Sequence, residues 1–234
     1  IENFGSMDVL CTDKTGTLTM GVVQLDGAVD PAGQPSQEVM LLAYLNAHLQ
    51  TGLPNALDEA ITSQNSVQTD GYEKVDEIPY DFIRKRLSVV VKKETQHTLI
   101  VKGAYESVLS ACDRLQMDGQ NLHLDSEYLG KLHALYEGWS QQGYRVLGVA
   151  QKTVQPQQEP FEAKDEAGLV FSGFLLFFDP PKPGVEKTIE ELRQMGVSLK
   201  IITGDNALVA RHVAEALKLS EVNILTGKDL NTLP

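Results

Sequence analysis

The chain has 234 residues, of which 42% are hydrophobic and 22% charged, and its net charge is −12. This composition is typical of a globular protein with one large domain or two small ones. The acidic balance excludes a nucleic-acid-binding surface, because phosphate contacts need a basic surface, but a local cluster of positive groups could still hold a single nucleotide.

Cys11 and Cys112 are too few for a disulfide framework and lack metal-site spacing, which favours two reduced thiols. The most apolar stretch, 168–178, is shorter than the roughly 20 residues of a membrane-spanning helix. It therefore predicts a buried strand pair or one long strand, and no membrane insertion by this chain. No signal peptide is present, and with almost no lead-in to its first strand we expect the chain to be part of a larger protein.

Hydrophobic periodicity and turn residues predict the elements in chain order. In the first half they predict strands at 7–12 and 22–26, helices at 37–49 and 56–64, strands at 72–80, 86–93 and 97–103, and a helix at 104–112. The second half reads as an amphipathic helix at 126–143, a strand at 144–152, a polar loop at 153–168, a helix at 183–196, a strand at 197–203 and a helix at 204–219.

The last three elements follow the βαβ pattern of a parallel sheet. The strands at 86–93 and 97–103, separated by a short polar loop, predict a β-hairpin. The two ends of the chain therefore indicate an α/β fold, and the middle an antiparallel α+β insertion.

Two polar loops follow predicted parallel strands. Asp13 ends the first strand, and Thr203, Gly204 and Asp205 end the strand at 197–203. Because ligands bind beyond the carboxyl ends of parallel strands, we expect the two loops to converge on one site.

The first loop has the composition of a phosphoryl-accepting site. A carboxylate such as Asp13 can form an acyl phosphate, and Lys14, Thr15 and the amides running into Gly16 could supply donors to the transferred group. Thr203 could donate its hydroxyl to the same group. The alternative is a polar turn in which Asp13 caps a neighbour.

Four motifs occur together in one order: DKTGTLT (13–19), KGA (102–104), DPPK (179–182) and TGDN (203–206). In these motifs nearly the whole chain resembles the P-type ATPases, which are membrane cation pumps. The resemblance implies an α/β Rossmannoid, haloacid-dehalogenase-like phosphorylation domain with an inserted α+β antiparallel-sheet nucleotide-binding domain. The expected bounds are 1–22 and 171–234 for the phosphorylation domain, incomplete at its C-terminus, and 23–170 for the insertion.

The resemblance implies roles for the two loops. Asp13 takes the γ-phosphate of ATP, with Lys14 beside it in the catalytic motif, and Thr15 holds the phosphate. Asp13 and the backbone carbonyl of Thr15 bind Mg²⁺. Thr203 and Gly204 bind phosphoryl oxygens, and Asp205 orients this loop and the nucleotide.

The resemblance also implies an adenine pocket in the middle domain. Lys102 and Gly103 form its floor, Tyr80 stacks on the base and Lys85 reaches toward the phosphates. Tyr80 could instead be a packed strand aromatic, with the alignment shifted to Phe82.

The other nucleotide contacts implied by the resemblance lie in separate segments. Asp58 accepts a hydrogen bond from the adenine amino group, unless it is a solvated helix carboxylate, and Arg145 contacts the phosphates, unless it forms a surface ion pair. Asp179 and Lys182 of DPPK are also assigned to the nucleotide. The family usually has arginine at the last position, so Lys182 keeps the charge but loses the bidentate fork.

The segments HLQTGLPNALDEAI and FLLFFDPPKP look most like the bacterial magnesium-importing subgroup, with proton pumps as the nearest rival. The resemblance implies ATP and Mg²⁺ as cofactors, transmembrane and actuator parts of a parent chain as partners, and the cytoplasmic face of the cell membrane as location. An ATP-sensing module and a soluble phosphatase are alternatives. Thr15 stands where such phosphatases usually have a second Asp, which disfavours hydrolysis.

The family also needs a lysine and a GDGxND loop after TGD. The lysine would neutralise the phosphoryl charge. We identify neither sequence between 206 and 234, so we expect this chain to bind ATP without turning it over.

Overall fold

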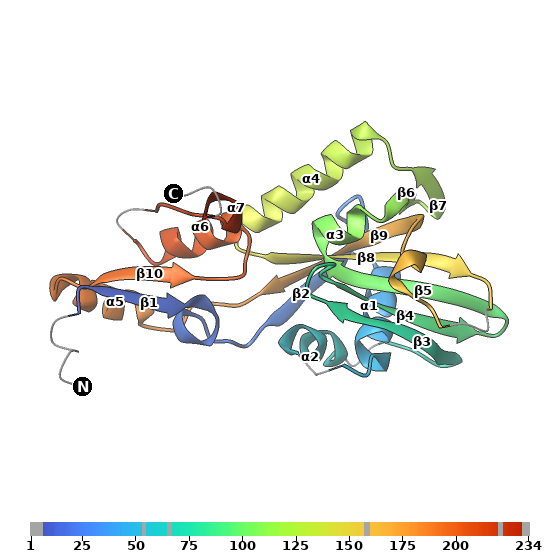
Figure 1. Ribbon diagram of the computed structural model, residues 1–234, viewed down its shortest axis with the longest axis horizontal. Helices are drawn as coiled ribbons and strands as arrows, with labels where there is room; N and C mark the ends of the chain where they lie inside the picture. Colours follow the sequence, from blue (N-terminus) through green and yellow to red (C-terminus); the bar gives the residue numbers. More distant parts are fainter. Residues whose placement is uncertain (1–6, 53–54, 65–66, 157–159, 220–221, 231–234) are drawn as a thin grey trace. The chain divides into compact units, whose positions relative to one another are not determined.

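The computed structural model describes residues 7–52, 55–64, 67–156, 160–219 and 222–230 (Figure 1). The chain divides into two compact units. Unit 1 comprises Ile1–Val23, Glu137–Arg145 and Phe178–Pro234, and unit 2 comprises Gln24–Tyr136 and Val146–Phe177. None of the described helices combines the length and the apolar character that crossing a bilayer requires.

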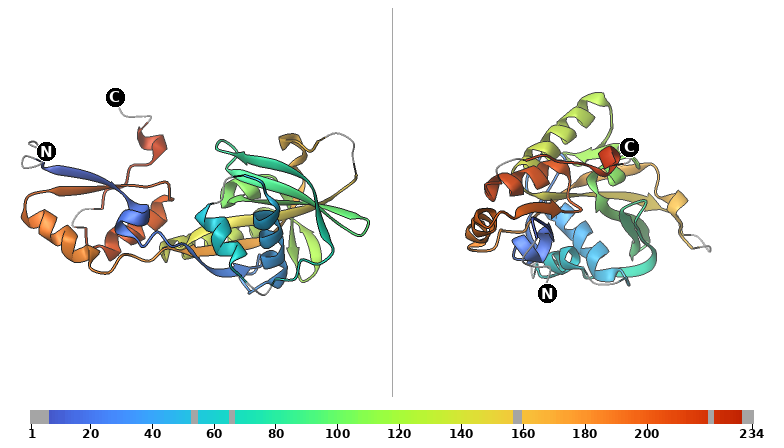
Figure 2. Two further views of the ribbon diagram at one scale, coloured as in Figure 1. Left: turned by 90° about the horizontal axis from the view of Figure 1, so that it is seen from below. Right: turned by 60° about the vertical axis from the view of Figure 1, so that its left-hand side comes forward.

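Unit 1 is built on two parallel strands, β1 (Val9–Asp13) and β10 (Ser198–Ile202). Figures 1 and 2 show the strands side by side, with helices α5 (Val185–Gln194) and α6 (Ala207–Ala216) next to them. A short helix, α7 (Gly227–Leu230), follows. The small core of this unit consists of one side chain from the first loop and three from the helices and their ends: Leu18, Ile189, Val213 and Leu217.

Unit 2 contains a mixed sheet. Among the described residues its strand order is β3-β4-β5-β8-β9-β6-β7, with β2 paired to β9. The strands are β2 (Gln24–Val29), β3 (Tyr72–Asp81), β4 (Arg86–Lys93), β5 (Gln96–Ala104), β6 (Cys112–Met117), β7 (Gln120–His123), β8 (Arg145–Val154) and β9 (Leu169–Phe178). The helices are α1 (Gln37–Leu49), α2 (Ala56–Thr62), α3 (Tyr105–Leu109) and the first part of α4 (Ser126–Gln141), with a 3₁₀ turn at Ala163–Asp165. From Glu137 onward α4 belongs to unit 1.

The centre of this sheet is buried on both faces. Three successive residues of β4, Val89–Val91, and three of β5, Leu99–Val101, are all at most 1% exposed. Successive side chains of a strand point to opposite faces, so such a run requires cover on both. Helix α1 packs against β4 and β5 (Figure 1). It begins where expected, because the Ser36 hydroxyl accepts a hydrogen bond from the Val39 amide.

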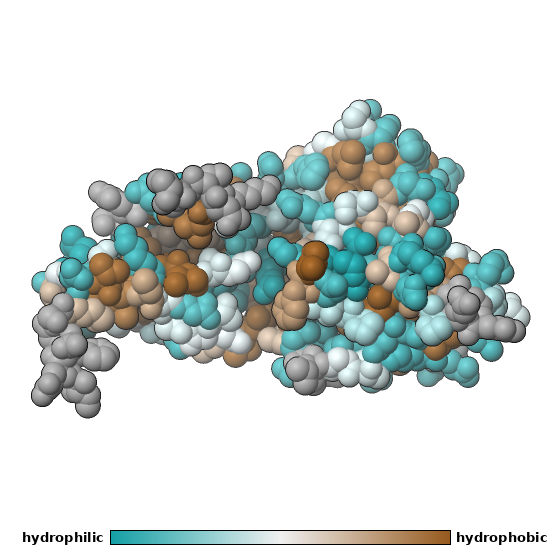
Figure 3. All heavy atoms as spheres, viewed as in Figure 1, coloured by the Kyte–Doolittle hydropathy of each residue, from teal (hydrophilic) through white to brown (hydrophobic). Residues whose placement is uncertain are grey.

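The part of unit 2 that carries the strands β3, β4 and β5 is mainly polar on the side that Figure 3 shows. In the view of Figure 3, hydrophilic residues cover most of the region occupied by the strands β3, β4 and β5. This distribution accords with a net charge of −12.

Most of the predicted elements are confirmed, and the stretch 168–178 is one long strand, which was one of the two predicted alternatives. There are two corrections. The second strand runs over Gln24–Val29 rather than 22–26, since Val22 lies in an exposed connection and pairing with β9 carries the strand past Gly27. The middle of the chain is not purely antiparallel, because β6 pairs with β9 in parallel.

The hairpin of β6 and β7 was missed by sequence reasoning. Its turn places Asp118 and Gly119 at φ 51° and 74°. An Asp-Gly pair between alternating strands is the sequence signal for such a turn, so this hairpin could have been predicted.

The two units divide at other positions than the expected domains. The expected boundary between 170 and 171 falls inside β9, whose residues Leu169–Phe177 belong to unit 2 because β9 is paired with its neighbours in that sheet. The segment Glu137–Arg145 groups with unit 1, although it was expected within 23–170. The identity of the two domains stays a prediction at this point.

Candidate functional site

The first loop leaves β1 through a tight turn. Asp13 is the last residue of β1, and Lys14–Leu18 form a turn in which Thr15 and Gly16 depart from helical backbone angles and Gly16 adopts φ 75°. Only glycine adopts this conformation at little cost, so the turn requires Gly16. The Asp13 and Thr15 residues are exposed, whereas Lys14 is 6% exposed.

The second loop lies beside the first. In the parallel pairing of β1 with β10, Asp13 is opposite Ile202, so the loop that begins at Thr203 leaves from the same edge of the sheet. Lys14 Nζ and Asp205 Oδ2 are 2.5 Å apart and nearly buried, and the Asp205 amide donates to Thr203 Oγ1 at 3.1 Å. The structure therefore brings the two predicted loops together.

This ion pair distinguishes the two aspartates. The Asp205 carboxylate is neutralised by Lys14 and is 6% exposed, whereas Asp13 remains exposed at the strand end. A nucleophile has to be accessible, so the geometry favours Asp13 over Asp205 as the reacting group. Lys14, which we expected to donate a hydrogen bond to the transferred phosphoryl group, forms an ion pair with Asp205.

The DPPK segment supports the first loop. The Asp179 carboxylate accepts hydrogen bonds from the Thr19 hydroxyl at 2.6 Å and from the Gly21 amide at 3.0 Å. Lys182 donates its backbone amide to the Leu18 carbonyl at 2.9 Å and its ammonium to the Gly16 carbonyl. Both residues were assigned to the nucleotide, and the structure places both in contact with the loop that follows Asp13.

In unit 2, two predicted residues form a buried ion pair. The ammonium of Lys102, in β5, contacts the carboxylate of Asp58, in the first turn of α2. Asp58 also accepts from Gln50 at 3.1 Å and from Asn55, the cap of α2, at 2.6 Å. Burial lowers the pKa of Lys102, and Asp58 opposes that shift. Asp58 is therefore not a solvated helix carboxylate.

The turn between β3 and β4 carries the other predicted nucleotide contacts. Tyr80 is 50% exposed and meets the ring of Phe82 edge-on, at 5.4 Å between centroids. Lys85 is exposed and has φ 51°. The register pairs Arg86 with Gly103 and Leu87 with Lys102, so this turn and the KGA segment share one end of the sheet.

Arg145 is the exposed first residue of β8, two positions before Leu147, which is opposite Ala104. Arg145 groups with unit 1, because it is the last residue of the segment Glu137–Arg145 of that unit. No ion pair of Arg145 occurs among the described residues, so the alternative of a surface ion pair is not supported there.

Sequence reasoning missed Gln50, Asn55 and Glu166. The amides of Gln50 and Asn55 complete the surroundings of Asp58. Glu166 pairs with arginines about 80 positions away, which no local pattern can reveal.

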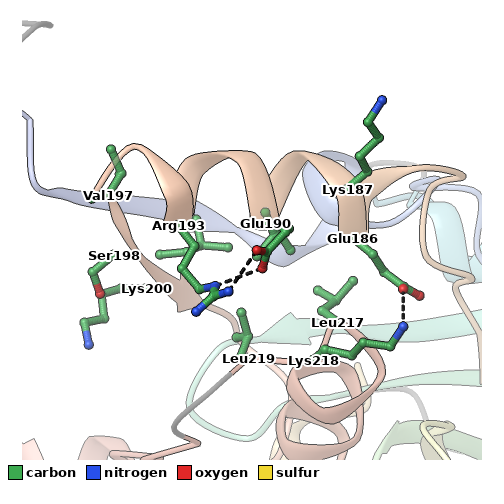
Figure 4. Close-up of a pocket in the computed structure, with 13 residues that line it drawn as sticks. Glu186, Lys187, Glu190, Arg193, Val197, Ser198, Lys200, Leu217, Lys218 and Leu219 are labelled. Carbon is green, nitrogen blue, oxygen red and sulfur yellow. Dashed lines mark hydrogen bonds and ion pairs between the residues drawn. The ribbon is translucent and has the colours of Figure 1, made fainter.

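A separate hollow of about 650 Å³ lies between α5, β10 and the end of α6 (Figure 4). Ion pairs cross its wall, between Arg193 and Glu190 and between Lys218 and Glu186, both within 2.9 Å. None of the predicted site residues lines this hollow. Among the described residues, no three His, Cys, Asp or Glu side chains gather as a metal cluster.

Comparison with known proteins defines the class. The family described as "P-type ATPase, cytoplasmic domain N" matches residues 34–184. The chain belongs to the P-type ATPase family.

Within the family, the chain is 39% identical to "Magnesium-transporting ATPase, P-type 1" of Escherichia coli (strain K12), over the whole chain and 27% of that relative. It is 38% identical to the protein of that name in Salmonella typhimurium (strain LT2), over 26% of that relative. With "Calcium-transporting ATPase 1" of Lactococcus lactis the identity is 30%, over 29% of the relative. The chain thus spans about a quarter of the length of these relatives.

Proposed function

We propose that this chain is the ATP-binding and phosphoryl-accepting cytosolic portion of a cation-transporting P-type ATPase. Unit 1 would be part of the haloacid-dehalogenase-like phosphorylation domain, and unit 2 the nucleotide-binding domain. The observation that carries the proposal is the arrangement at the end of β1, where Asp13 is exposed while the neighbouring Asp205 is neutralised by Lys14.

In the proposed reaction, an Asp13 carboxylate oxygen attacks the γ-phosphorus of ATP. A bond forms between that oxygen and phosphorus, the bond from phosphorus to the β–γ bridging oxygen breaks, and ADP leaves with the electron pair. Thr15 and Thr203 would donate hydrogen bonds to the phosphoryl oxygens. Asp179 and Lys182 would act by holding the first loop, since both contact it directly.

The residues present fit Mg²⁺ as a cofactor. Mg²⁺ in phosphoryl-transfer sites is held by one or two carboxylates together with phosphates and water. Asp13 offers one carboxylate and Thr15 a carbonyl oxygen, and no larger acidic cluster occurs among the described residues. When bound there, Mg²⁺ would neutralise charge on the transferred phosphoryl group.

The adenine site would lie at the end of the sheet where the β3–β4 turn meets KGA. Tyr80 presents an aromatic ring that is half exposed, as stacking on a base requires. Lys85 and Arg145 would meet the phosphates. Asp58 already accepts from Lys102, Gln50 and Asn55, and a carboxylate has about four lone-pair positions, so one remains for the adenine amino group.

The similarity to the relatives supports a proposal for the identity of the transported ion. We propose Mg²⁺ as the cargo, because the magnesium-transporting relatives reach 38–39% identity and the calcium-transporting relative 30%. Calcium or proton transport is the alternative within the family. The parent protein would act at the cytoplasmic face of the cell membrane, together with its transmembrane and actuator parts.

Nucleotide binding is tested by titrating the ¹⁵N-labelled chain with ATP and following amide shifts. We expect perturbations at Tyr80, Lys85 and Lys102, and the absence of any at millimolar ATP would contradict the proposal. The 234 residues contain no GDGxND sequence. We therefore expect no acid-stable label from γ-labelled ATP on the chain alone, and a label on Asp13 would contradict that expectation.

Phosphoryl acceptance is tested in a chimera. The chain replaces the matching quarter of the E. coli relative, and the acid-stable label and Mg²⁺ uptake are measured. We expect Asp13→Asn to abolish both, whereas Asp8→Asn, an exposed aspartate before β1, should preserve both. Label that persists in Asp13→Asn would contradict the role of Asp13.

A further inference from the structure

Glu166 is a buried carboxylate held by three donors from β4 and the turn before it. Its side chain is fully buried, and one oxygen accepts from Arg84 Nη1 at 2.5 Å and Arg86 Nε at 2.7 Å, while the other accepts from Ser88 Oγ at 2.6 Å. Arg86 and Ser88 are two positions apart in β4, so they point to the same face of the strand, and Arg84 reaches Glu166 from the β3–β4 turn. Glu166 thus joins the segment after the 3₁₀ turn to the start of β4.

The two arginines flank Lys85. Arg84 and Arg86 are 18% and 13% exposed and both are paired with Glu166. Within the part of the chain that the structure describes, the exposed Lys85 ammonium has no hydrogen-bond or ion-pair partner. Of three consecutive cations, therefore, Arg84 and Arg86 share the Glu166 carboxylate, Arg84 Nε also lies 3.8 Å from Asp81 Oδ2, and Lys85 is left to meet an anion.

The same arginines fix the backbone around Lys85. Arg84 Nη2 donates to the Pro79 carbonyl at 2.8 Å, next to Tyr80, and Arg86 Nη1 donates to the Ser107 carbonyl at 2.7 Å. The Lys85 carbonyl accepts from the Ala104 amide at 2.9 Å. Glu166 therefore orients both ends of the turn through its two partners.

We infer that Glu166 is a positioning residue for the binding of nucleoside triphosphates. By holding Arg84 and Arg86 in ion pairs, it presents the Lys85 ammonium as the phosphate contact of the β3–β4 turn. This inference rests on the proposed ATP-binding function. It concerns the phosphate end of the nucleotide, because the adenine contacts depend on Tyr80 and Asp58.

The inference predicts a selective loss of phosphate recognition. With Glu166→Gln the arginines lose their carboxylate, and the Lys85 turn loses its fixed position. We expect the affinity for ATP to fall about five-fold and the affinity for adenosine to change less than two-fold, with Lys85→Ala costing far less in Glu166→Gln than in the unchanged chain. The four chains to be compared are the unchanged chain, Glu166→Gln, Lys85→Ala and the double variant. Calorimetric titration of each with ATP and with adenosine gives the ratios of dissociation constants.

Controls separate positioning from structural damage. Glu127→Gln makes the same chemical change at an exposed glutamate of α4 and should alter neither affinity. Arg84→Ala leaves Glu166 paired with Arg86 and should reproduce the selective loss if Glu166→Gln does not fold.

The outcomes are distinguishable. Equal losses for ATP and adenosine, or a full Lys85→Ala effect retained in Glu166→Gln, would overturn the positioning role. If the unchanged chain binds no ATP, or if Lys85→Ala has no effect in it, the proposed nucleotide site itself fails, and the positioning role fails with it.

Discussion

Gly103 and Lys85 approach each other so closely that no side chain fits between them. A β-carbon on residue 103 would lie 2.4 Å from the Lys85 carbonyl oxygen, and 2.5 Å from the Arg86 β-carbon. Contacts this short require the backbone to move. The path of the neighbouring turn thus requires a glycine at this position of KGA, and the turn can come this close only because residue 103 has no side chain.

Gly103→Ala should destabilise the chain by about 1–3 kcal/mol, the usual cost of overpacking, and displace the Lys85 turn. Urea unfolding measures the first effect and ATP titration the second. The matched control is Gly130→Ala in α4, where nothing lies within 4 Å of the added carbon. That change should stabilise the helix by about 0.5–1 kcal/mol, and a similar gain in Gly103→Ala would refute the steric argument.

Tyr80→Ala should weaken ATP binding about ten-fold, because stacking of a base on an aromatic ring contributes about 1–3 kcal/mol. Stability should change little, since Tyr80 is 50% exposed. Tyr80→Phe should bind as the unchanged chain does. If Phe82→Ala has the large effect and Tyr80→Ala has none, the alignment shifted to Phe82 is the right one.

Lys102→Met should destabilise the chain by about 3–5 kcal/mol, because it leaves the Asp58 carboxylate buried without its cation. The double variant Asp58→Leu/Lys102→Met should recover most of this loss in urea unfolding, while ATP binding stays impaired. Additive losses in the double variant would show that the two side chains do not act as a pair.

Asp179→Asn should destabilise unit 1 by about 1–3 kcal/mol. The two donors contact different oxygens of the carboxylate, and an amide has an NH₂ group in place of one of them, so one of the two contacts is lost. Thermal unfolding followed by amide NMR should show the loss at Thr19 and Gly21. Equal stability of Asp179→Asn and the exposed control Asp8→Asn would mean that these two contacts contribute nothing.

The β3–β4 turn should respond to acid only at low pH. Hydrogen bonds from the Arg84 and Ile83 amides hold the pKa of Asp81 below its ordinary 3.8. A depressed pKa means that the stabilising contact is present above the unfolded-state value and is lost as pH falls through the folded-state value. Amide shifts of Ile83 and Arg84 should therefore titrate with a midpoint below 3.8, and not at all in Asp81→Asn.

Local patterns predicted the elements that follow local rules. Alternation of apolar residues, the Ser36 cap and the glycines at helix ends gave the helices and most strands within a few residues. The phosphoryl loops could also be placed together, because parallel strands end at one edge of a sheet. The β6–β7 hairpin was missed although its Asp-Gly turn carries a signal.

Long-range partnerships were beyond sequence reasoning. Ion pairs join residues that are 44 to 191 positions apart in the sequence: Lys14 with Asp205, Lys102 with Asp58, and Glu166 with its arginines. Each pair forms because burial makes an isolated charge costly, and burial is a property of the packed chain. The roles predicted for Lys14 and Asp58 accordingly did not include these pairings.

Strand β9 has a consequence for how the protein is made. It completes the sheet of unit 2 by pairing with β2, although some 140 residues separate them, and it is almost wholly apolar. Contacts between distant segments form late in folding, and their partners remain exposed until then. During synthesis on the ribosome, β2 has no pairing partner until β9, which ends at residue 178, has been synthesised. The sheet of this unit is therefore completed only after nearly all of the unit has emerged.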